Sequence, residues 1–279
     1  MKATKIILAA LFLAAATTEV SAQKMKLNLT SGSTMEFNAS EVKNIEFEEA
    51  AKDTTSSTTT DDGTYHNGHE YVDLGLPSGL KWATCNVGAE NSYDYGDYYA
   101  WGETETKSDY RTSTYKWYAT STVKSTDADG FVTSVTYSGY TKYVSQSSAS
   151  RDGYKGFYDD KTTLDAEDDV AHVKWGGNWR MPTSREFVEL ESKCTWTFVS
   201  LNGKTGYKVT GPNGKYIFLP AAAFHGGSQY AGSYGNYWSS LLGMDYSHNA
   251  MYLYFNGSRS LNMSGDYRTE GRSVRPVCE

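Results

Sequence analysis

The chain has 279 residues, a formal net charge of −7 and a sequence pI of about 5.3. An acidic chain without a basic stripe is a poor partner for nucleic acid or for anionic membranes, so we expect it to bind neither. Tyr accounts for 23 of the residues, and tyrosine suits half-wet surfaces better than a dry core. The length allows one large domain with a small appendage.

The first residues have the three parts of a secretory signal peptide. Lys2 and Lys5 form a basic region, residues 6–16 are apolar, and Val20-Ser21-Ala22 is typical of a cleavage site. We therefore predict a signal peptide over residues 1–22 and an exported protein that is secreted, held at the cell surface or periplasmic. The apolar run is shorter than the roughly 20 residues of a membrane span, so we expect no transmembrane segment after cleavage.

Three segments follow the predicted signal peptide. Residues 23–48 alternate apolar and polar in MKLNL and TMEF, which predicts a small β segment with a turn at Ser31-Gly32 and a third strand at Ile45–Phe47. Residues 49–68 are dominated by Thr, Ser and Asp, a composition typical of a flexible linker. Residues 69–279 then form the globular part.

Two helices are predicted in the middle of the globular part, after strands around a turn at residues 77–79 and a hairpin arm in GFVTSVTYSGY. The segment LDAEDDVAHVKW, residues 164–175, carries acids first, which suits the positive end of a helix dipole. Thr183 and Glu186 form a capping box ahead of an apolar face that includes Phe187.

Beyond residue 195 the sequence consists of short alternating segments separated by glycine turns. In MYLYF, Met251, Leu253 and Phe255 share one face of a strand, and Tyr252 and Tyr254 take the other. The globular part is therefore predicted to be α+β, with two helices against several short antiparallel strands.

The cysteines are Cys85, Cys194 and Cys278, an odd number for an exported protein. Three pairings are possible and at most one bridge can form. We predict a disulfide between Cys85 and Cys194, which leaves Cys278 as a free or intermolecular thiol. The chain has no C-x-x-C sequence, so its cysteines give no support for a redox or zinc site.

Several segments of the globular part, taken in order, resemble one protein family. The segments are EYVDLGLPSGLKWATCNVGA, DYGDYYAWGET, LDAEDDVAHVKWGGNWRMPTSREFVEL, CTWTF, YWSS and SVRPV. They are similar to the Fibrobacter succinogenes major paralogous domain family. More distantly, WRMPTSREF, HGGS and SVRPV resemble landmarks of the sulfatase-modifying-factor-like, C-type-lectin-like fold. The resemblance implies a C-type-lectin-like domain in an exported bacterial protein, with no established activity for the family.

Two departures from the wider fold bear on its chemistry. Its formylglycine-generating members use a C-terminal cysteine pair with copper, and here Cys278 has no second cysteine near it. The calcium-dependent sugar site of true C-type lectins needs E-P-N or Q-P-D, and in Gly211-Pro212-Asn213 glycine replaces the carboxylate. The pair His66 and His69 lacks an acidic partner at ligand spacing. We therefore expect no catalytic residue, no metal and no cofactor.

The resemblance also suggests which residues are structural. It places Arg180 and Arg275 in landmark segments close to the core, where a guanidinium can tie carbonyls or a carboxylate together. Trp175, Trp179 and Trp238 are expected in the core, because Trp is highly buried on average.

In C-type-lectin-like folds the ligand face is built by the late loops, and here these are rich in Tyr, Asn, Ser and Gly. Such loops on a rigid scaffold favour non-covalent recognition, since the rings supply area and the polar groups supply hydrogen bonds. The expected ligand residues are Tyr230, Tyr234, Tyr237, Tyr246, His248, Asn249, Asn262, Asp266, Tyr267 and Arg268.

We therefore expect a non-catalytic binding module for a glycan or protein ligand outside the cell. The alternative is a structural or adhesive surface subunit in which residues 24–48 pair with the sheet edge of a partner. A third hypothesis is an uncharacterised enzyme, for which the sequence offers no catalytic constellation.

Overall fold

The computed structural model describes residues 24–28, 34–38, 64–258 and 261–279. The chain divides into two units, Met1–Ser57 and Thr58–Glu279, which are considered separately. The predicted signal peptide, the predicted strand at Ile45–Phe47 and most of the predicted linker lie outside the described residues. Among the described residues, no helix has the length and apolar character that crossing a bilayer requires.

The described part of the first unit is a pair of strands. β1 (Lys24–Asn28) and β2 (Thr34–Asn38) are antiparallel, with Met25 opposite Phe37 and Leu27 opposite Met35. This pairing confirms the hairpin that the alternation of apolar residues predicts, although its turn lies outside the described residues.

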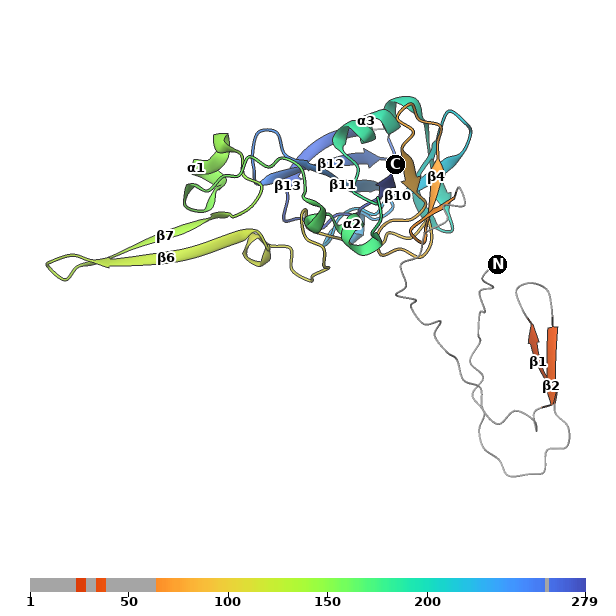
Figure 1. Cartoon of the computed structure of the whole chain (residues 1–279), viewed down its shortest axis with the longest axis horizontal. Helices are drawn as coiled ribbons and strands as arrows, with labels where there is room; N and C mark the ends of the chain where they lie inside the picture. Colours follow the sequence, from red (N-terminus) through yellow and green to blue (C-terminus); the bar gives the residue numbers. More distant parts are fainter. Residues whose placement is uncertain (1–23, 29–33, 39–63, 259–260) are drawn as a thin grey trace, which may run out of the picture. The chain divides into compact units, whose positions relative to one another are not determined.

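The second unit is mainly antiparallel β-sheet with a few short helices (Figure 1). One sheet contains β3 (Tyr65–His66), β4 (His69–Asp73), β5 (Lys81–Ala83) and β14 (Val277–Cys278) in the order β14-β5-β4-β3. A second contains β8 (Thr195–Leu201), β9 (Lys204–Thr210) and β10 (Tyr216–Pro220). A third contains β11 (Tyr234–Leu242), β12 (Asn249–Asn256) and β13 (Leu261–Tyr267), with β12 in the centre. The α+β prediction therefore holds at this level of detail.

The linker boundary predicted at residue 68 is wrong by a few residues. β3 begins at Tyr65, and the His66 side chain accepts a hydrogen bond from the backbone of Asn178 at 2.9 Å. The His69 ring stacks on Trp175 with 3.9 Å between ring centroids. These two histidines therefore help to fix the start of the globular unit.

The two predicted helices form, together with the short α1 (Ala149–Asp152), which the sequence analysis did not predict. α3 (Ser184–Lys193) has the capping box of Thr183 and Glu186 that the sequence predicts. α2 (Val170–Trp175) is shorter than predicted, because the acidic segment before it forms a 3-10 turn at Ala166–Asp168. Asp169 then caps α2 by accepting hydrogen bonds from its first backbone N–H groups.

The core lies between these helices and the sheets. One cluster gathers Trp101, Trp175, Trp179 and Trp238, and a second gathers Trp82, Phe187, Tyr237, Leu253 and Phe255. Gly235 in β11 faces this second cluster, where a Cβ would lie 2.2 Å from the Phe255 ring. The close packing of β11 on β12 therefore requires glycine at this position.

β6 (Tyr118–Thr126) and β7 (Val132–Tyr140) form a separate two-stranded ribbon, which extends away from the other elements of the second unit (Figure 1). Only its base is buried, at Gly139 and Tyr140. The predicted hairpin arm is thus correct, but its length and isolation are not evident from the sequence pattern.

Candidate functional site

One face of the β11–β13 sheet carries a row of polar and aromatic side chains. Along β11, Tyr234, Asn236 and Trp238 alternate with Gly235 and Tyr237, which face the second core cluster, and they lie opposite Asn256, Tyr254 and Tyr252 of β12. This is the face that the period-two pattern assigns to Tyr252 and Tyr254 in the sequence. The late segments therefore do meet on one surface.

A pocket of about 450 Å³ opens over this face. It is lined by the sheet, by the loop before β11 and by the segment after β13: Phe224, Tyr234, Asn236, Tyr252, Tyr254, Asp266, Glu270 and Arg272. Only Tyr234 and Asp266 among them belong to the expected ligand residues. The pocket is nevertheless built by the part of the chain that the sequence analysis singled out.

Arg272 forms the floor of the polar side of the pocket. Its side chain is almost completely buried and forms an ion pair with Asp266, whose side chain is 41% exposed. The guanidinium carbon lies 3.8 Å from the centroid of the Tyr252 ring and 4.8 Å from that of Trp238. The backbone of Arg272 exchanges hydrogen bonds with Tyr99, both at 3.0 Å, so the residue is held at both ends.

The tyrosine side of the pocket consists of neighbouring rings. Tyr234 has its ring centroid 5.3 Å from that of Tyr230 and 5.9 Å from that of Tyr254. The Phe224 ring also stacks on Tyr234, with 6.4 Å between ring centroids. Tyr230 itself is 45% exposed and extends the aromatic surface beyond the pocket lining. Rings in this arrangement offer both an apolar face and phenol hydroxyls to a ligand.

Two carboxyl groups and one guanidinium line the pocket. Burial raises the pKa of Glu270, with the nearby carboxylate of Asp266 acting in the same direction and Arg272 opposing it. Burial lowers the pKa of Arg272 from the ordinary arginine value. The pocket therefore holds charges of both signs with an acidic excess, which makes it unsuited to a strongly anionic ligand.

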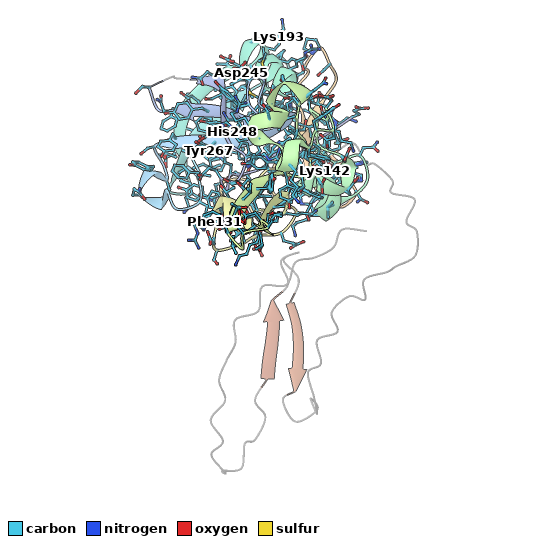
Figure 2. The ribbon with its side chains drawn as sticks, turned by 90° about the vertical axis from the view of Figure 1, so that its left-hand side faces the viewer. Phe131, Lys142, Lys193, Asp245, His248 and Tyr267 are labelled. Atoms are coloured by element: carbon cyan, nitrogen blue, oxygen red, sulfur yellow. The ribbon has the colours of Figure 1, made fainter. Side chains whose placement is uncertain are left out.

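A second group of expected ligand residues forms a stack elsewhere on the surface. The rings of Tyr246 and His248 are 5.1 Å apart, and those of His248 and Tyr267, neighbours in Figure 2, are 5.5 Å apart. Arg151 lies over Tyr246 at 4.1 Å. His248 Nδ1 lies 3.0 Å from Asp152 Oδ1, which ties the stack to α1. None of these five residues lines the pocket.

Two of the expected ligand residues are wrong. Tyr237 is completely buried, because it lies opposite Leu253 on the face of β11 that packs into the second core cluster. Its hydroxyl donates to the Pro220 carbonyl at 2.6 Å. Arg268 is also completely buried, and donates to the backbone carbonyls of residues 142, 143 and 247 at 2.7 to 3.0 Å.

The remaining expected ligand residues flank the site. Asn262 is exposed on β13 opposite Tyr254, on the pocket face but outside the lining. Asn249 is half-buried at the start of β12, where its carbonyl accepts a hydrogen bond from Gly243 at 2.8 Å. Asn249 therefore shapes the loop before β12.

The residues expected to be structural lie where a structural role requires. Trp179 and Trp238 are fully buried and Trp175 nearly so. Arg275 is fully buried and donates hydrogen bonds to the side-chain oxygen of Asn86 and to three backbone carbonyls, of residues 83, 84 and 218. Arg180 pairs with Glu186 at 2.7 Å, next to the capping box of α3.

The predicted disulfide is absent, since neither Cys85 nor Cys194 nor Cys278 forms a disulfide in the structure. Cys85 lies in the turn after β5, where its sulfur donates to the Glu90 carbonyl at 3.8 Å. Cys194 follows the last turn of α3, and burial raises its pKa to about 11. Sequence spacing carries no information on the distance between two cysteines, so it cannot predict which of them pair.

Among the described residues, three carboxyl groups lie close enough to hold a cation: Asp165, Glu167 and Asp168. Lysines neutralise them, however. Lys142 Nζ lies 2.7 Å from Asp165 and 2.6 Å from Asp168, and Lys116 lies 3.0 Å from the other oxygen of Asp168. These acids therefore serve ion pairs that join the segment before α2 to the base of the β6–β7 ribbon.

The site residues that sequence reasoning missed are Phe224, Asn236, Tyr252, Tyr254, Glu270 and Arg272. For Tyr252 and Tyr254 the signal was present, since the alternation in MYLYF places both on the face away from the core. For Arg272 no sequence signal exists, because its partners come from other strands.

Comparison with protein-family models, with curated proteins and with solved structures gave no significant match to this chain. The resemblance to the major paralogous domain family therefore stays a prediction that rests on the motifs themselves.

Proposed function

We propose that residues 69–279 form an exported, C-type-lectin-like binding module that recognises a glycan in the pocket over β11–β13. The observation that carries this proposal is the lining of the pocket, where Tyr234, Tyr252 and Tyr254 stand beside Asp266, Glu270 and Arg272. The C-type-lectin-like fold is supported by the order of α2 and α3 followed by antiparallel strands, together with the motif resemblance. Export rests on the signal-peptide pattern of residues 1–22.

A sugar ring needs two kinds of contact, and the pocket offers both. Its C–H face packs on an aromatic ring, while its hydroxyl groups donate to carboxylates and accept from guanidinium or amide N–H groups. Rings and polar groups line the same pocket, so one sugar can contact both at once. The acidic excess favours a neutral or amino sugar over a sulfated or uronic one.

The rigid support of the pocket also favours binding over catalysis. Most lining residues belong to strands, and Arg272 is fixed by Tyr99, Asp266 and Tyr252. Preorganised groups reduce the entropy that a ligand must overcome on binding. We assign no residue a role in bond making or breaking.

The test is an array of neutral, amino and acidic glycans probed with the purified protein, followed by titration calorimetry on each hit. Tyr254→Ala in the pocket is compared with Tyr216→Ala, an exposed tyrosine of the β8–β10 sheet. We expect Tyr254→Ala to weaken binding about 10-fold or more, in line with the loss of one aromatic stacking contact, and Tyr216→Ala to leave it unchanged.

Three outcomes would overturn the proposal. An array without hits, or with acidic glycans only, contradicts the ligand class. Binding that both variants retain places the ligand elsewhere on the protein, for which a Tyr246→Ala variant tests the stack of Tyr246, His248 and Tyr267. If Tyr254→Ala and Tyr216→Ala lose glycan binding equally, and circular dichroism shows an altered fold in both, the loss is due to unfolding and not to the pocket.

The alternative function, a structural or adhesive subunit, depends on the N-terminal unit and not on the pocket. In the hypothesis from the sequence, residues 24–48 pair with the sheet edge of a partner; in the structure β1 and β2 pair with each other. Deleting residues 24–64 separates the two functions, because glycan binding would survive the deletion and assembly on a partner would fail.

A further inference from the structure

The β6–β7 ribbon has an edge that is open to another strand. Each strand is nine residues long, and in the described part of the chain each pairs only with the other, apart from a bridge between Tyr140 and Gly153 at the base. Residues 122–138 are all exposed. An isolated two-stranded ribbon is marginally stable in water, and three or more strands are usually needed.

The two strands differ in how they protect their edges. Natural edge strands usually carry lysine, proline or a bulge that discourages further pairing. β6 carries Lys124, whereas β7, with the sequence VTSVTYSGY, contains no charge and no proline. β7 is therefore the edge that can accept a further strand without bringing like charges together.

Apolar side chains on the ribbon are exposed to an unusual degree. Val123 is 48% exposed, and its partner across the ribbon, Val135, is 51% exposed. Phe131 at the hairpin tip, labelled in Figure 2, is 68% exposed, and Val132 beside it is 54% exposed. These side chains bury little apolar surface in the isolated ribbon, and a neighbouring strand would bury more of it.

We propose that β7 pairs antiparallel with β7 of a second copy of this chain, with Val135 on the two-fold axis. The hydrogen-bond pattern of the hairpin shows which groups of β7 are free for this pairing, and an axis through Val135, midway between residues 132 and 138, is the one that pairs all of them. Asp127 N–H donates to the Phe131 carbonyl at 3.1 Å, so these two residues form a hydrogen-bonded pair. Along an antiparallel ladder such pairs alternate with pairs whose backbone N–H and C=O groups point away from the partner strand. The groups that point outward from β7 are therefore those of residues 132, 134, 136 and 138.

A two-fold axis through Val135 places Ser134 opposite Thr136 of the second copy, and Val132 opposite Ser138 of the second copy. Each outward backbone N–H of residues 132–138 then faces a backbone carbonyl of the other copy. Such an interface is isologous and closes as a dimer. The paired segment is about 24 Å long, and because the strands run antiparallel, the two globular units lie at opposite ends of the shared sheet.

The resulting four-stranded sheet explains the exposed valines. Val123 and Val135 of one copy and the same residues of the other form one row of four on a single face of the sheet. Thr133 lies opposite Tyr137 of the partner on the same face. Cross-strand pairs of β-branched and aromatic residues are those that stabilise sheets most.

The test compares two proline variants of the full protein by sedimentation velocity over a concentration series. Thr122 and Thr136 lie opposite each other, and their side chains share a hydrogen bond of 3.0 Å. Thr136→Pro and Thr122→Pro thus lose the same side-chain contact and each add proline at an outer edge. Only Thr136→Pro blocks the proposed interface, where it removes one donor from each copy, and we expect it to weaken dimerisation about 30-fold.

A cysteine pair tests the register. Val135→Cys brings two thiols together on the two-fold axis at a separation suited to a disulfide, whereas Val123→Cys on β6 keeps them apart. Mild oxidation is expected to give a covalent dimer of Val135→Cys and no more dimer of Val123→Cys than of the parent protein. A monomer at all concentrations, equal effects of the two prolines, or equal cross-linking of the two cysteine variants would each overturn the proposal.

Discussion

The guanidinium carbon of Arg272 lies 3.8 Å from the centroid of the Tyr252 ring, while the guanidinium pairs with Asp266, another residue of the pocket lining. This contact joins the floor of the pocket to the central strand β12. A buried cation costs free energy unless it is paired and stacked, and Arg272 is both. The positions of Tyr252 and Asp266 in the pocket therefore depend on Arg272.

Arg272→Lys keeps the positive charge but removes the planar group that covers Tyr252. We expect the free energy of unfolding to fall by about 1–2 kcal/mol, measured by urea denaturation, because stacking and part of the hydrogen bonding are lost. Glycan binding should weaken in the same variant. Arg185→Lys, a change at an exposed residue of α3, serves as the control and should have no measurable effect. Unchanged stability and binding of Arg272→Lys would contradict the role assigned to this contact.

Arg268→Met tests whether Arg268 is structural. The substitution keeps a long side chain but removes all the donors that satisfy three buried backbone carbonyls. We expect the free energy of unfolding to fall by about 3 kcal/mol or more, since an unsatisfied buried acceptor costs roughly 1–3 kcal/mol. Urea denaturation followed by circular dichroism measures it. If Arg268→Met has normal stability but no longer binds glycan, Arg268 is a ligand-binding residue and the structural assignment is wrong.

The sequence allowed the prediction of the parts of the fold that depend on local chemistry. The capping box of Thr183 and Glu186 starts α3 as expected, because both partners lie within one helical turn. The alternation in β12 placed Tyr252 and Tyr254 on one face correctly, because the period of a strand is fixed by its backbone.

The parts that failed depend on contacts between distant segments. The composition of the loop before β11 does not show which face of the strand Tyr237 takes, and a shift of one position along a strand moves a side chain to the opposite face of the sheet. Arg272 gives no signal of its own, since its environment is made by Trp238, Tyr252 and Asp266 from three different strands. A disulfide between Cys85 and Cys194 needed a distance that spacing in the sequence does not contain.

Asp152→Asn is expected to be less stable than the parent protein in a pH-dependent manner. Burial alone would raise the pKa of Asp152, but hydrogen bonds from Arg151 and His248 outweigh it and the pKa is lowered. A lowered carboxyl pKa contributes stability above the unfolded pKa of about 3.9, and this contribution is lost as the pH falls through the folded pKa. The parent should therefore exceed the variant at pH 7 by about 1–3 kcal/mol and approach it below about pH 4.

Thermal unfolding between pH 3 and 8 measures this difference between Asp152→Asn and the parent protein. Asp245→Asn is the matched control, because Asp245 is an exposed residue of the loop that Asp152 holds through the Ser247 backbone at 3.0 Å. The control should follow the parent at every pH. A stability difference for Asp152→Asn that stays constant down to pH 3 would show that the carboxylate charge is not the cause.

Tyr237→Phe and Tyr234→Ala test which face of β11 lines the pocket and which faces the second core cluster. Tyr237→Phe removes the hydroxyl that donates to the Pro220 carbonyl and leaves the packed ring in place. The same hydroxyl accepts a hydrogen bond from Asn86 at 3.4 Å. We expect a loss of about 1–2 kcal/mol in the free energy of unfolding, as for two buried hydrogen bonds, and unchanged glycan binding, since the ring faces the second core cluster. Tyr234→Ala should do the opposite, because its partly exposed ring lines the pocket: binding falls about 10-fold while stability changes little. If Tyr237→Phe lost binding and kept its stability, the assignment of the two faces would be reversed.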